Sequence, residues 1–345
     1  MKKKRKDTSP KPIETGEVSV RHGESYWRYA WRRFRRHRLA MVAGVVLVIL
    51  ILGAIFAPWL SPYNYSRQNR SNMFDAPSFR VEEDQVEDKC VRPRVLWWRC
   101  GVHPFGTDDL GRDILTRVLQ GGRVSLIVGF SAAFISTLLG TMIGAIAGYW
   151  GGIIDSLTSR LIEIMLSIPQ LPLLLILVGL LANPEVQFGV FLTGLLGDSK
   201  SIVMIIGVII LLSWMGTARL VRGQVIALKQ RDFVEAARAV GASRIRIAFR
   251  HLLPNVTSVI IVQGTLMTGE AILIESGLSF LGLGIQPPAV SWGNMLSRAQ
   301  GFLYYPNGIY IAFFPGLCIL LTVLCANFVG DGLRDALDPR YHGRV

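Results

Sequence analysis

The sequence LAMVAGVVLVILILGAIFAPWL, residues 39–60, contains no Asp, Glu, Lys or Arg. About 20 apolar residues in an α-helix cross the hydrocarbon core of a bilayer, which is about 30 Å thick. Further stretches without these four residue types lie at 124–154, 164–184, 201–218, 276–297 and 299–330. The chain of 345 residues is 51% hydrophobic and 18% charged, with a mean hydropathy of +0.40. These features exclude a soluble enzyme and an intrinsically disordered chain, and they predict an all-α polytopic membrane protein.

The distribution of basic residues predicts which side of the membrane each connection occupies. Residues 1–38 hold 13 of the 37 Lys and Arg, and residues 219–250 hold eight more. Because Lys and Arg are enriched on the cytoplasmic side of spans, both segments are expected inside the cell. This accounts for the net charge of +13 without nucleic acid as a partner. Six spans with both termini in the cytoplasm then follow, at 39–60, 124–149, 161–182, 201–218, 256–280 and 308–330.

The spans divide the chain into five predicted regions. These are a cytoplasmic basic tail with an interfacial helix at 1–38, the first span at 39–60, an extracytoplasmic loop with an amphipathic segment at 61–123, a core of five spans at 124–330 that includes a cytoplasmic loop at 219–255, and a cytoplasmic C-terminal tail at 331–345. The first span is about twice as long as the apolar part of a signal peptide, and no small-x-small cleavage site follows it. It is therefore expected to remain uncleaved.

The basic leader contains a predicted interfacial helix at 24–38. Trp27, Trp31 and Phe34 share one face of this helix, and five arginines cover the remaining faces. An aromatic stripe opposed by arginines suits the headgroup plane of a membrane. A solvated basic helix is the alternative.

Proline and glycine interrupt two of the predicted spans. Pro169 and Pro172 lie early in the third span, where they are expected to kink or start its helix. The fifth span runs into several glycines and prolines, so its helix is expected to end by about residue 281. The apolar segment 276–297 is therefore predicted to be re-entrant or interfacial and packed against protein, and not a seventh span. The uncharged segment 186–197 is too short to cross and is expected at the outer surface.

The most informative stretch outside the spans is RDFVEAARAVGASRIRIAFRHLLP, residues 231–254. Asp232 is expected to cap a helix whose third residue is Glu235, the capping-box arrangement. Gly241 suits the left-handed position that ends this helix, and Ser243 is expected to cap a second one. The stretch ends at a proline that is expected to open the next membrane segment. Two short helices with small side chains would form a compact knob that another protein can approach closely.

Part of this stretch resembles the EAA loop of ABC importer permeases. The matching residues are Glu235, Ala236, Ala237, Gly241, Leu253 and Pro254. The family pattern ends in Ile-x-Leu-Pro, and His251 replaces the isoleucine here, which is a feature of the oligopeptide/dipeptide/nickel branch. Other segments similar to that branch follow in the expected order, at 103–113, 278–284 with 292–293, and 330–339. The resemblance covers about 24–60 and 103–345 and leaves 61–102 outside it.

By this resemblance the chain is similar to the second, C-type permease of a binding-protein-dependent transport system in the bacterial cytoplasmic (inner) membrane. The resemblance implies the type I ABC importer permease fold, with six transmembrane helices. It also implies as partners a homologous permease subunit, two ATPase subunits that bind ATP and Mg, an extracytoplasmic solute-binding protein and the lipid membrane. The residues that would couple this chain to an ATPase subunit are Asp232, Glu235, Ala236, Ala237, Gly241, Leu253 and Pro254. The chain would form half of a translocation path for di- or oligopeptides, with nickel or another small solute as the alternative.

No chemistry is predicted for this chain itself. It has no G-x-x-x-x-G-K-[ST] sequence, so ATP hydrolysis is expected in separate subunits. No catalytic residue, cofactor or metal site is predicted, because no Cys/His cluster has zinc spacing and no Gly-x-Ser-x-Gly elbow occurs. Asp108 and Asp109 do not fit the calcium-loop pattern. Together with Thr107 they are expected to cap an amphipathic helix that leads into the second span.

Two acids and two cysteines are further candidate site residues. Glu270 and Glu275 lie within the fifth span, where a carboxylate is costly, so both are candidates for the translocation path. They lie about 140° apart on a helix and do not form a pair. Satisfying backbone donors at the glycine-rich break is the alternative for Glu275. Cys90 and Cys100 lie in the predicted outer loop, where an oxidising exterior permits a disulfide, and two free thiols are the alternative.

Two functions from other classes stay open on the sequence alone. An ion- or proton-driven secondary carrier would have repeated halves with broken helices and coupling acids near the membrane midplane. The sequence shows one broken region and no visible repeat. A membrane scaffold without transport activity would leave Glu270 and the broken fifth span unexplained.

Overall fold

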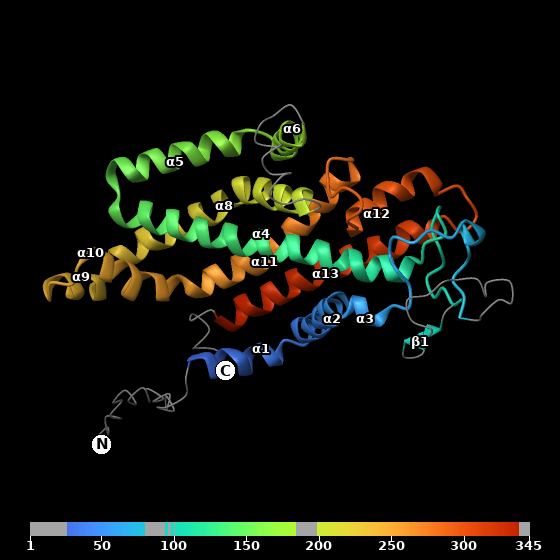
Figure 1. Ribbon diagram of the computed structural model, residues 1–345. Coiled ribbons are helices and arrows are strands. Elements are labelled where there is room, and N and C mark those ends of the chain that lie inside the picture. Colours follow the sequence, from blue (N-terminus) through green and yellow to red (C-terminus); the bar gives the residue numbers. More distant parts are fainter. Residues whose placement is uncertain (1–25, 80–93, 96–97, 100, 184–198, 338–345) are drawn as a thin grey trace, which may run out of the picture.

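The computed structural model describes residues 26–79, 94–95, 98–99, 101–183 and 199–337, which form a bundle of long helices (Figure 1). The N-terminal part contains α1 (Tyr26–Arg36), α2 (Arg38–Ile55), α3 (Ala57–Leu60) and the 3-10 turn η1 (Arg70–Asn72). The middle part contains α4 (Ile114–Trp150), α5 (Gly152–Ser167), α6 (Gln170–Ala182) and α8 (Lys200–Lys229). The C-terminal part contains α9 (Asp232–Ala239), α10 (Arg244–Arg246), the π-helical η4 (Ile247–Leu252), α11 (Leu253–Phe280), α12 (Trp292–Ala299), the 3-10 turn η5 (Gln300–Phe302) and α13 (Ile309–Leu337). Two short strands, β1 (Arg94–Val95) and β2 (Trp98–Arg99), pair antiparallel.

Five helices in the described residues are long and apolar enough to cross a membrane. They are α2, α4, α8, the continuous helix Arg244–Phe280 and α13. They correspond to the first, second, fourth, fifth and sixth predicted spans. Much of α2 faces outward, and its exposed apolar side chains include Leu39, Val42, Val45, Val48, Ile49, Leu52 and Ile55. Such a surface is stable only against lipid or another apolar protein surface.

The third predicted span, 161–182, is not one straight helix. It is divided between α5 and α6, which meet at an angle of 90°. Ile168 has extended backbone angles (φ −85°, ψ 130°) and precedes Pro169, as expected because proline disfavours the helical conformation in the residue before it. The two helices make up the sixth candidate span only if they are counted together.

The centre of the bundle is the close pair of α4 and α8. Gly140, Gly144 and Gly148 recur every four residues on α4, and the backbone of α8 lies directly against all three. A Cβ atom added at Gly148 would lie 2.8 Å from the carbonyl oxygen of Arg222. Small residues at this spacing allow two helix backbones to approach closely in a membrane, where the hydrophobic effect does not drive helix association.

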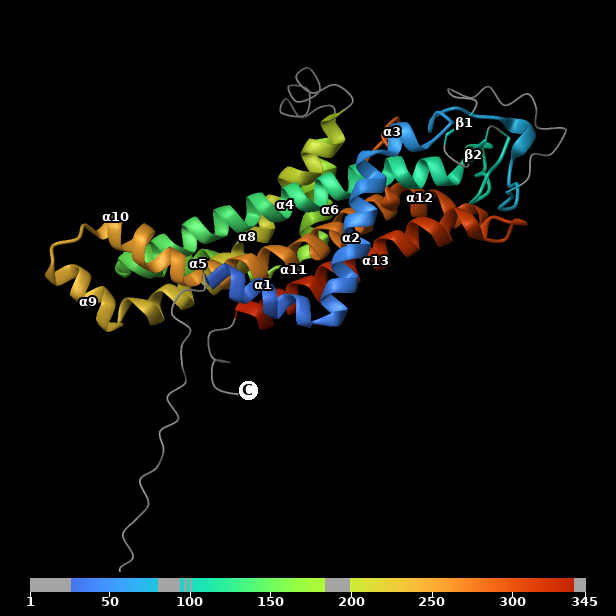
Figure 2. The same cartoon turned by 90° about the horizontal axis from the view of Figure 1, so that it is seen from below.

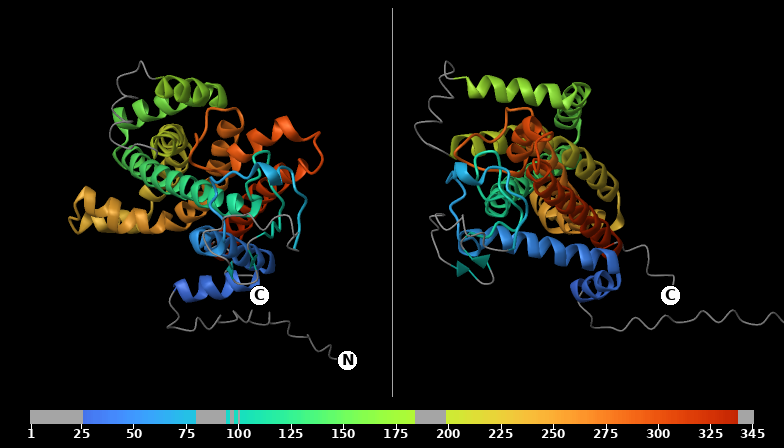
Figure 3. Two further views of the ribbon diagram at one scale, coloured as in Figure 1. Left: turned by 45° about the vertical axis from the view of Figure 1, so that its right-hand side comes forward. Right: turned by 90° about the vertical axis from the view of Figure 1, so that its right-hand side faces the viewer.

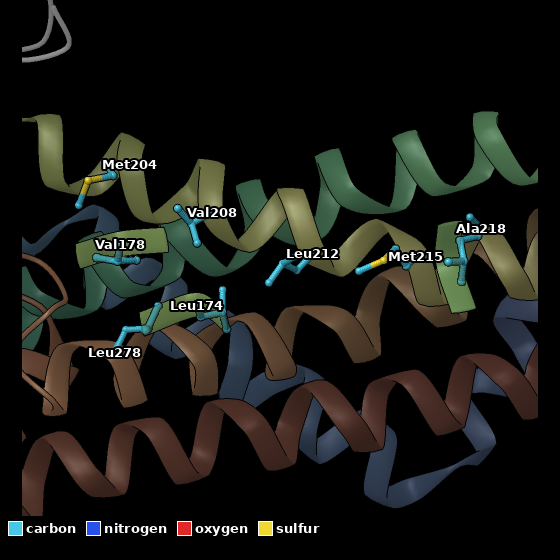
Figure 4. Close-up of a cluster of buried hydrophobic side chains, with 9 residues drawn as sticks. Leu174, Val178, Met204, Val208, Leu212, Met215, Ala218 and Leu278 are labelled. Carbon is cyan, nitrogen blue, oxygen red and sulfur yellow. The ribbon is translucent and has the colours of Figure 1, made fainter. Parts of the chain in front are cut away.

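The remaining helices lie on both sides of this pair. In the end-on view on the right of Figure 3, α5 and α6 lie on one side of the bundle and α1 and α2 on the other. Helix α2 crosses α13 obliquely (Figure 2). On the opposite side α6 packs on α8 through a cluster of buried apolar side chains (Figure 4). That cluster includes Leu174, Val178, Met204, Val208, Leu212, Met215 and Leu278.

Helix α1 packs on protein as well as presenting a basic surface. Phe34 is buried with Ala40 and Ala336, and its ring lies where Gly332 of α13 has no side chain. Trp31 stacks on Phe34 with ring centroids 5.9 Å apart and is 58% exposed. The predicted aromatic stripe is therefore divided, because Phe34 packs against α13 while Trp31 faces outward. The side chain of Trp27 lies outside the described residues.

The segment after α11 turns back against the bundle, as the sequence predicts. Helix α11 ends at Phe280, and Gly282 follows with a φ of +83°. After an irregular segment, Ser291 caps α12 in a capping box with Asn294. The indole nitrogen of Trp292 donates a hydrogen bond of 2.9 Å to the carbonyl oxygen of Val118 on α4. This hydrogen bond holds α12, and the segment that joins it to α11, against the bundle.

Candidate functional site

A pair of short helices projects from one end of the bundle, called here the α9 end (Figure 1). The residue that caps α9 is Arg231, with extended backbone angles (φ −88°, ψ 148°), and its side chain makes no capping hydrogen bond. The expectation that Asp232 caps this helix is therefore wrong, because Asp232 is already its first helical residue. Asp232 and Glu235 both lie in the first turn, where negative charge interacts favourably with the helix dipole.

The turn between the two helices depends on Gly241. Its φ is +82°, which confirms the predicted left-handed conformation. The amide of Gly241 donates to the carbonyl oxygen of Arg238 at 2.9 Å, and the amide of Ala242 donates to that of Ala237 at 3.0 Å. A Cβ atom at Gly241 would meet nothing within 4 Å, so the turn needs glycine for its backbone angles and not for space.

The second helix of the pair is continuous with the fifth span. Ser243 caps it as predicted, by accepting from the amide of Arg246. A wide π-helical segment then leads into α11, so a single helix runs over Arg244–Phe280. Pro254 therefore does not open a separate membrane segment. A widened turn next to a proline is one way in which a helix continues past it.

One face of this helix pair is buried and the other is exposed. Val234 is fully buried against side chains of α4 and α8. Glu235 and Ala236 are exposed, and Ala237 is half-buried. The outward surface also carries large apolar side chains, namely Phe233, Val240, Ile245 and Phe249. Clustered apolar exposure of this kind is typical of an interaction surface.

Charged contacts connect α8 to α4 and α5 close to the helix pair. The ammonium group of Lys229, next to α9, donates 2.6 Å to the carbonyl oxygen of Tyr149 at the end of α4. The guanidinium of Arg222 forms two hydrogen bonds with the carboxylate of Asp155 on α5, one of them 2.8 Å from Nη2 to Oδ2. Helices α4, α5 and α8 are thus connected to one another at the end of the bundle that carries the pair.

Glu275 lies at a polar node inside the bundle. Its side chain is fully buried and accepts hydrogen bonds from Ser279 (2.8 Å) and Ser125 (3.1 Å). Ser125 in turn accepts from the amide of Trp292, and Ser279 accepts from the amide of Ile285. Glu275 therefore orients two serine hydroxyls, and these accept hydrogen bonds from the amides of Ile285 and Trp292 beyond the glycine-rich break. Its role in the translocation path stays a prediction.

Glu270 is exposed on α11, in contrast to Glu275. Gln263 lies seven residues earlier, on the same helical face. It contributes to a cavity of about 530 Å³ between α8 and α11, whose lining includes Arg219, Gln224 and Gly216. Polar side chains on membrane-crossing helices are expensive and favour a path or a protein partner on this face. The sequence alone points to Glu270 and, through the seven-residue spacing, to Gln263, but it gives no signal for Arg219 and Gln224 on another helix.

The opposite end of the bundle is called here the α12 end. Helix α4 is capped there by Asp113, and not by Thr107, Asp108 or Asp109. Oδ2 of Asp113 accepts from the amide of Thr116 at 2.7 Å, and its Oδ1 lies 2.9 Å from Nδ1 of His103. The expectation for Thr107, Asp108 and Asp109 is thus wrong because they belong to the loop that precedes the helix. Asp108 and Asp109 instead pair with arginines. Cys90 and Cys100 lie outside the described residues.

These features define a polytopic membrane protein with an exposed helix pair that is continuous with its long apolar helices. Residues 140–343, more than half of the chain, match the family described as binding-protein-dependent transport system inner membrane component. Residues 25–77 match the N-terminal TM domain of oligopeptide transport permease C. The chain belongs to this family of ABC importer permeases and is an inner membrane component of a transport system.

Curated relatives match over nearly the full chain. The chain is 39% identical to the oligopeptide transport system permease protein OppC of Haemophilus influenzae, over 92% of this chain and 90% of the relative. It is 40% identical to the dipeptide transport system permease protein DppC of Alkalihalophilus pseudofirmus, over 92% and 90%. It is 38% identical to the glutathione transport system permease protein GsiD of Escherichia coli, over 92% and 91%. The resemblance to the oligopeptide and dipeptide branch is thereby confirmed.

Proposed function

We propose that this chain forms half of the translocation path of an ATP-driven peptide importer. The observation that carries the proposal is the helix pair at the α9 end, exposed on one side and built into the spans on the other. An ATPase subunit that docks on Glu235, Ala236 and the exposed apolar side chains around them would move α8 and α11 directly. The second helix of the pair is itself the beginning of the fifth span.

The remaining partners follow from this assignment. A homologous permease would cover the exposed apolar faces and complete the path, with the cavity that includes Arg219 and Gln263 on its wall. Two ATPase subunits would hold ATP and Mg, and an extracytoplasmic solute-binding protein would deliver the cargo at the α12 end. Both termini and the α9 end would then lie in the cytoplasm.

Short peptides are the proposed cargo. The relatives named above are permeases for oligopeptides, dipeptides and glutathione, which all contain peptide bonds. This range favours peptides over nickel or another small solute. Membership in a binding-protein-dependent family favours the importer over an ion-driven carrier or a scaffold.

Purification of the tagged chain from its native membrane in mild detergent tests the assembly. We expect a second permease and P-loop ATPase subunits to co-purify. Ala236→Arg places a long charged side chain on the exposed surface of α9 and should remove the ATPase subunits while the sister permease stays. Ala236→Ser is the matched control and should keep both.

Uptake into membrane vesicles tests the activity. A labelled short peptide, supplied with its binding protein, should accumulate only when ATP is present on the ATPase side. Recovery of the chain alone or as a homo-oligomer, even after crosslinking, would contradict the proposed assembly. Uptake that follows an ion gradient and ignores ATP would favour the secondary carrier.

A further inference from the structure

A second cavity lies at the α12 end, between the first turn of α4, the segment after α11 and α12. Its volume is about 370 Å³, which is within the usual range for ligand pockets. Side chains of Arg112, Arg117 and Arg298 line it, together with exposed Gln68 and Gln286. Among the described residues that line this cavity there is no Asp or Glu.

The nearest carboxylates lie next to the three arginines and do not line the cavity. Asp108 Oδ2 lies 2.7 Å from Nε of Arg112 and 3.5 Å from Nε of Arg117. Asp109 is held by Arg298 in a bidentate pair, with contacts of 2.7 Å and 3.0 Å from Nε and 2.7 Å from Nη2. These hydrogen bonds raise the pKa of the Arg298 guanidinium further above its usual value. Three guanidinium groups therefore share two carboxylates.

Arg112 carries an unsatisfied donor at this place. Only 9% of the residue is exposed, and Nη2 has no hydrogen-bond partner within the part of the chain that the structure describes. Its nearest acidic oxygen, Oδ1 of Asp109, is 3.8 Å away. Arg117 is also buried and donates from Nη1 to the carbonyl oxygen of Tyr65 at 3.2 Å. Nη2 of Arg112 is enclosed by protein atoms, so an anion in the cavity is attracted by the combined positive charge of the three guanidinium groups and not by a hydrogen bond to this atom.

We propose that this cavity binds the carboxylate group of a small solute through the positive charge of Arg112, Arg117 and Arg298. A planar carboxylate matches the fork of a guanidinium and would balance three arginines that share two carboxylates. The free C-terminus of a short peptide is the carboxylate that fits the proposed cargo. The inference rests on the proposed function only for this choice of solute.

Equilibrium binding to the full chain, with its co-purifying permease and ATPase subunits in nanodiscs and without the solute-binding protein, tests the site. The probe is radiolabelled trialanine, and the competitors are unlabelled trialanine and its C-terminal amide. We expect saturable binding that trialanine displaces, with the amide weaker by about tenfold or more. This factor corresponds to the loss of one charge-assisted hydrogen bond.

Two variants and one control locate the binding. Arg112→Gln removes one of the three positive charges, and Gln68→Glu places a competing carboxylate at the exposed rim of the cavity. Both should weaken trialanine binding by about tenfold or more. Arg123→Gln, at an exposed position on α4, should leave it unchanged. Gln68→Glu alters only an exposed side chain, so it remains informative if Arg112→Gln fails to fold.

Several results would overturn the inference. They are the absence of saturable trialanine binding, equal competition by acid and amide, or unchanged binding in Gln68→Glu. If the wild-type chain still supports ATP-dependent uptake when one of these results is obtained, the proposed function stands and only the binding site is contradicted. Loss of ATP-dependent uptake in the wild-type chain would instead count against the proposed function.

Discussion

The backbone angle of Gly241 determines whether the two helices at the α9 end can fold back on each other. An L-residue in the left-handed conformation costs about 1–2 kcal/mol, and a β-branched one is the least tolerated. Because a Cβ atom there would touch nothing within 4 Å, a substitution acts on the turn alone. Gly241 is therefore a site where coupling can be separated from membrane insertion.

We expect Gly241→Val to insert normally and to lose most ATP-dependent peptide uptake. The population of the native turn should fall by about tenfold for each 1.4 kcal/mol of strain. Uptake into vesicles, normalised to the amount of inserted protein, is the measurement. Gly241→Asn is the matched control, because asparagine tolerates the left-handed conformation and should keep most of the activity. Normal uptake by the valine variant would contradict a coupling role for this turn.

Glu275 and Glu270 differ in their surroundings, and their substitution should separate stability from transport. Glu275→Leu leaves the hydroxyls of Ser125 and Ser279 without their acceptor, at about 1–3 kcal/mol for each unsatisfied group. We expect a clear fall in the thermal unfolding temperature of the solubilised protein. Glu270→Gln, at an exposed position on the same helix, should leave that temperature unchanged and reduce uptake. Equal destabilisation by both changes would contradict the buried node.

At the scale of helices, the close contact of α4 and α8 depends on glycine spacing. A side chain at Gly144 would overlap the carbonyl oxygen of Ala218, whereas one at Gly207 on α8 would meet nothing within 4 Å. We expect Gly144→Leu to force the two helices apart and to abolish assembly with the partner subunits, at a cost of at least about 1–3 kcal/mol. Gly207→Leu is the matched control. Co-purification of the partner subunits with each variant is the measurement, and normal assembly of Gly144→Leu would contradict the packing.

The sequence predicts the helices better than their ends and their connections. Uncharged stretches locate the five helices that are long and apolar enough to cross a membrane, because charge is excluded from the hydrocarbon core whatever the tertiary packing. A proline in the sequence does not by itself predict whether a helix bends. Pro169 lies at a 90° bend, whereas Pro254 lies within a continuous helix. The predictions that Asp232 caps α9 and that Asp108 helps to cap α4 are wrong, and Arg231 and Asp113 hold these positions. Several neighbouring residues suit a cap, and the backbone angles decide between them.

The candidate site is only partly predictable for a similar reason. The turn between the two short helices is local, so the roles of Gly241 and Ser243 in its backbone follow from the order of residues along the chain. Glu275, by contrast, accepts a hydrogen bond from Ser125, which lies 150 positions earlier in the sequence. The polar cavity with Arg219 and Gln263, and the three arginines at the α12 end, also combine distant segments. No periodicity within one element marks such non-local groups.

At the scale of the whole molecule, the arrangement of the ends makes the orientation testable. His37 at the start of α2 and Asp335 near the end of α13 lie 3.9 Å apart, so both ends of the membrane domain are on one side. Tyr304, at the α12 end, is 98% exposed, and Val240, at the tip of the helix pair, is 89% exposed. If residues 219–250 are cytoplasmic, Asp335 and Val240 must share a compartment and Tyr304 must lie in the other.

Single cysteines in a chain whose four native cysteines are replaced by serine test this orientation. A membrane-impermeant maleimide should label Tyr304→Cys in intact spheroplasts, and it should label Val240→Cys and Asp335→Cys only after permeabilisation. Denatured protein is the control for the intrinsic reactivity of each cysteine, because a docked ATPase subunit would shield Val240 in the native complex. Labelling of Tyr304→Cys and Asp335→Cys from the same side would contradict this orientation, because the candidate span α13 (Ile309–Leu337) lies between them.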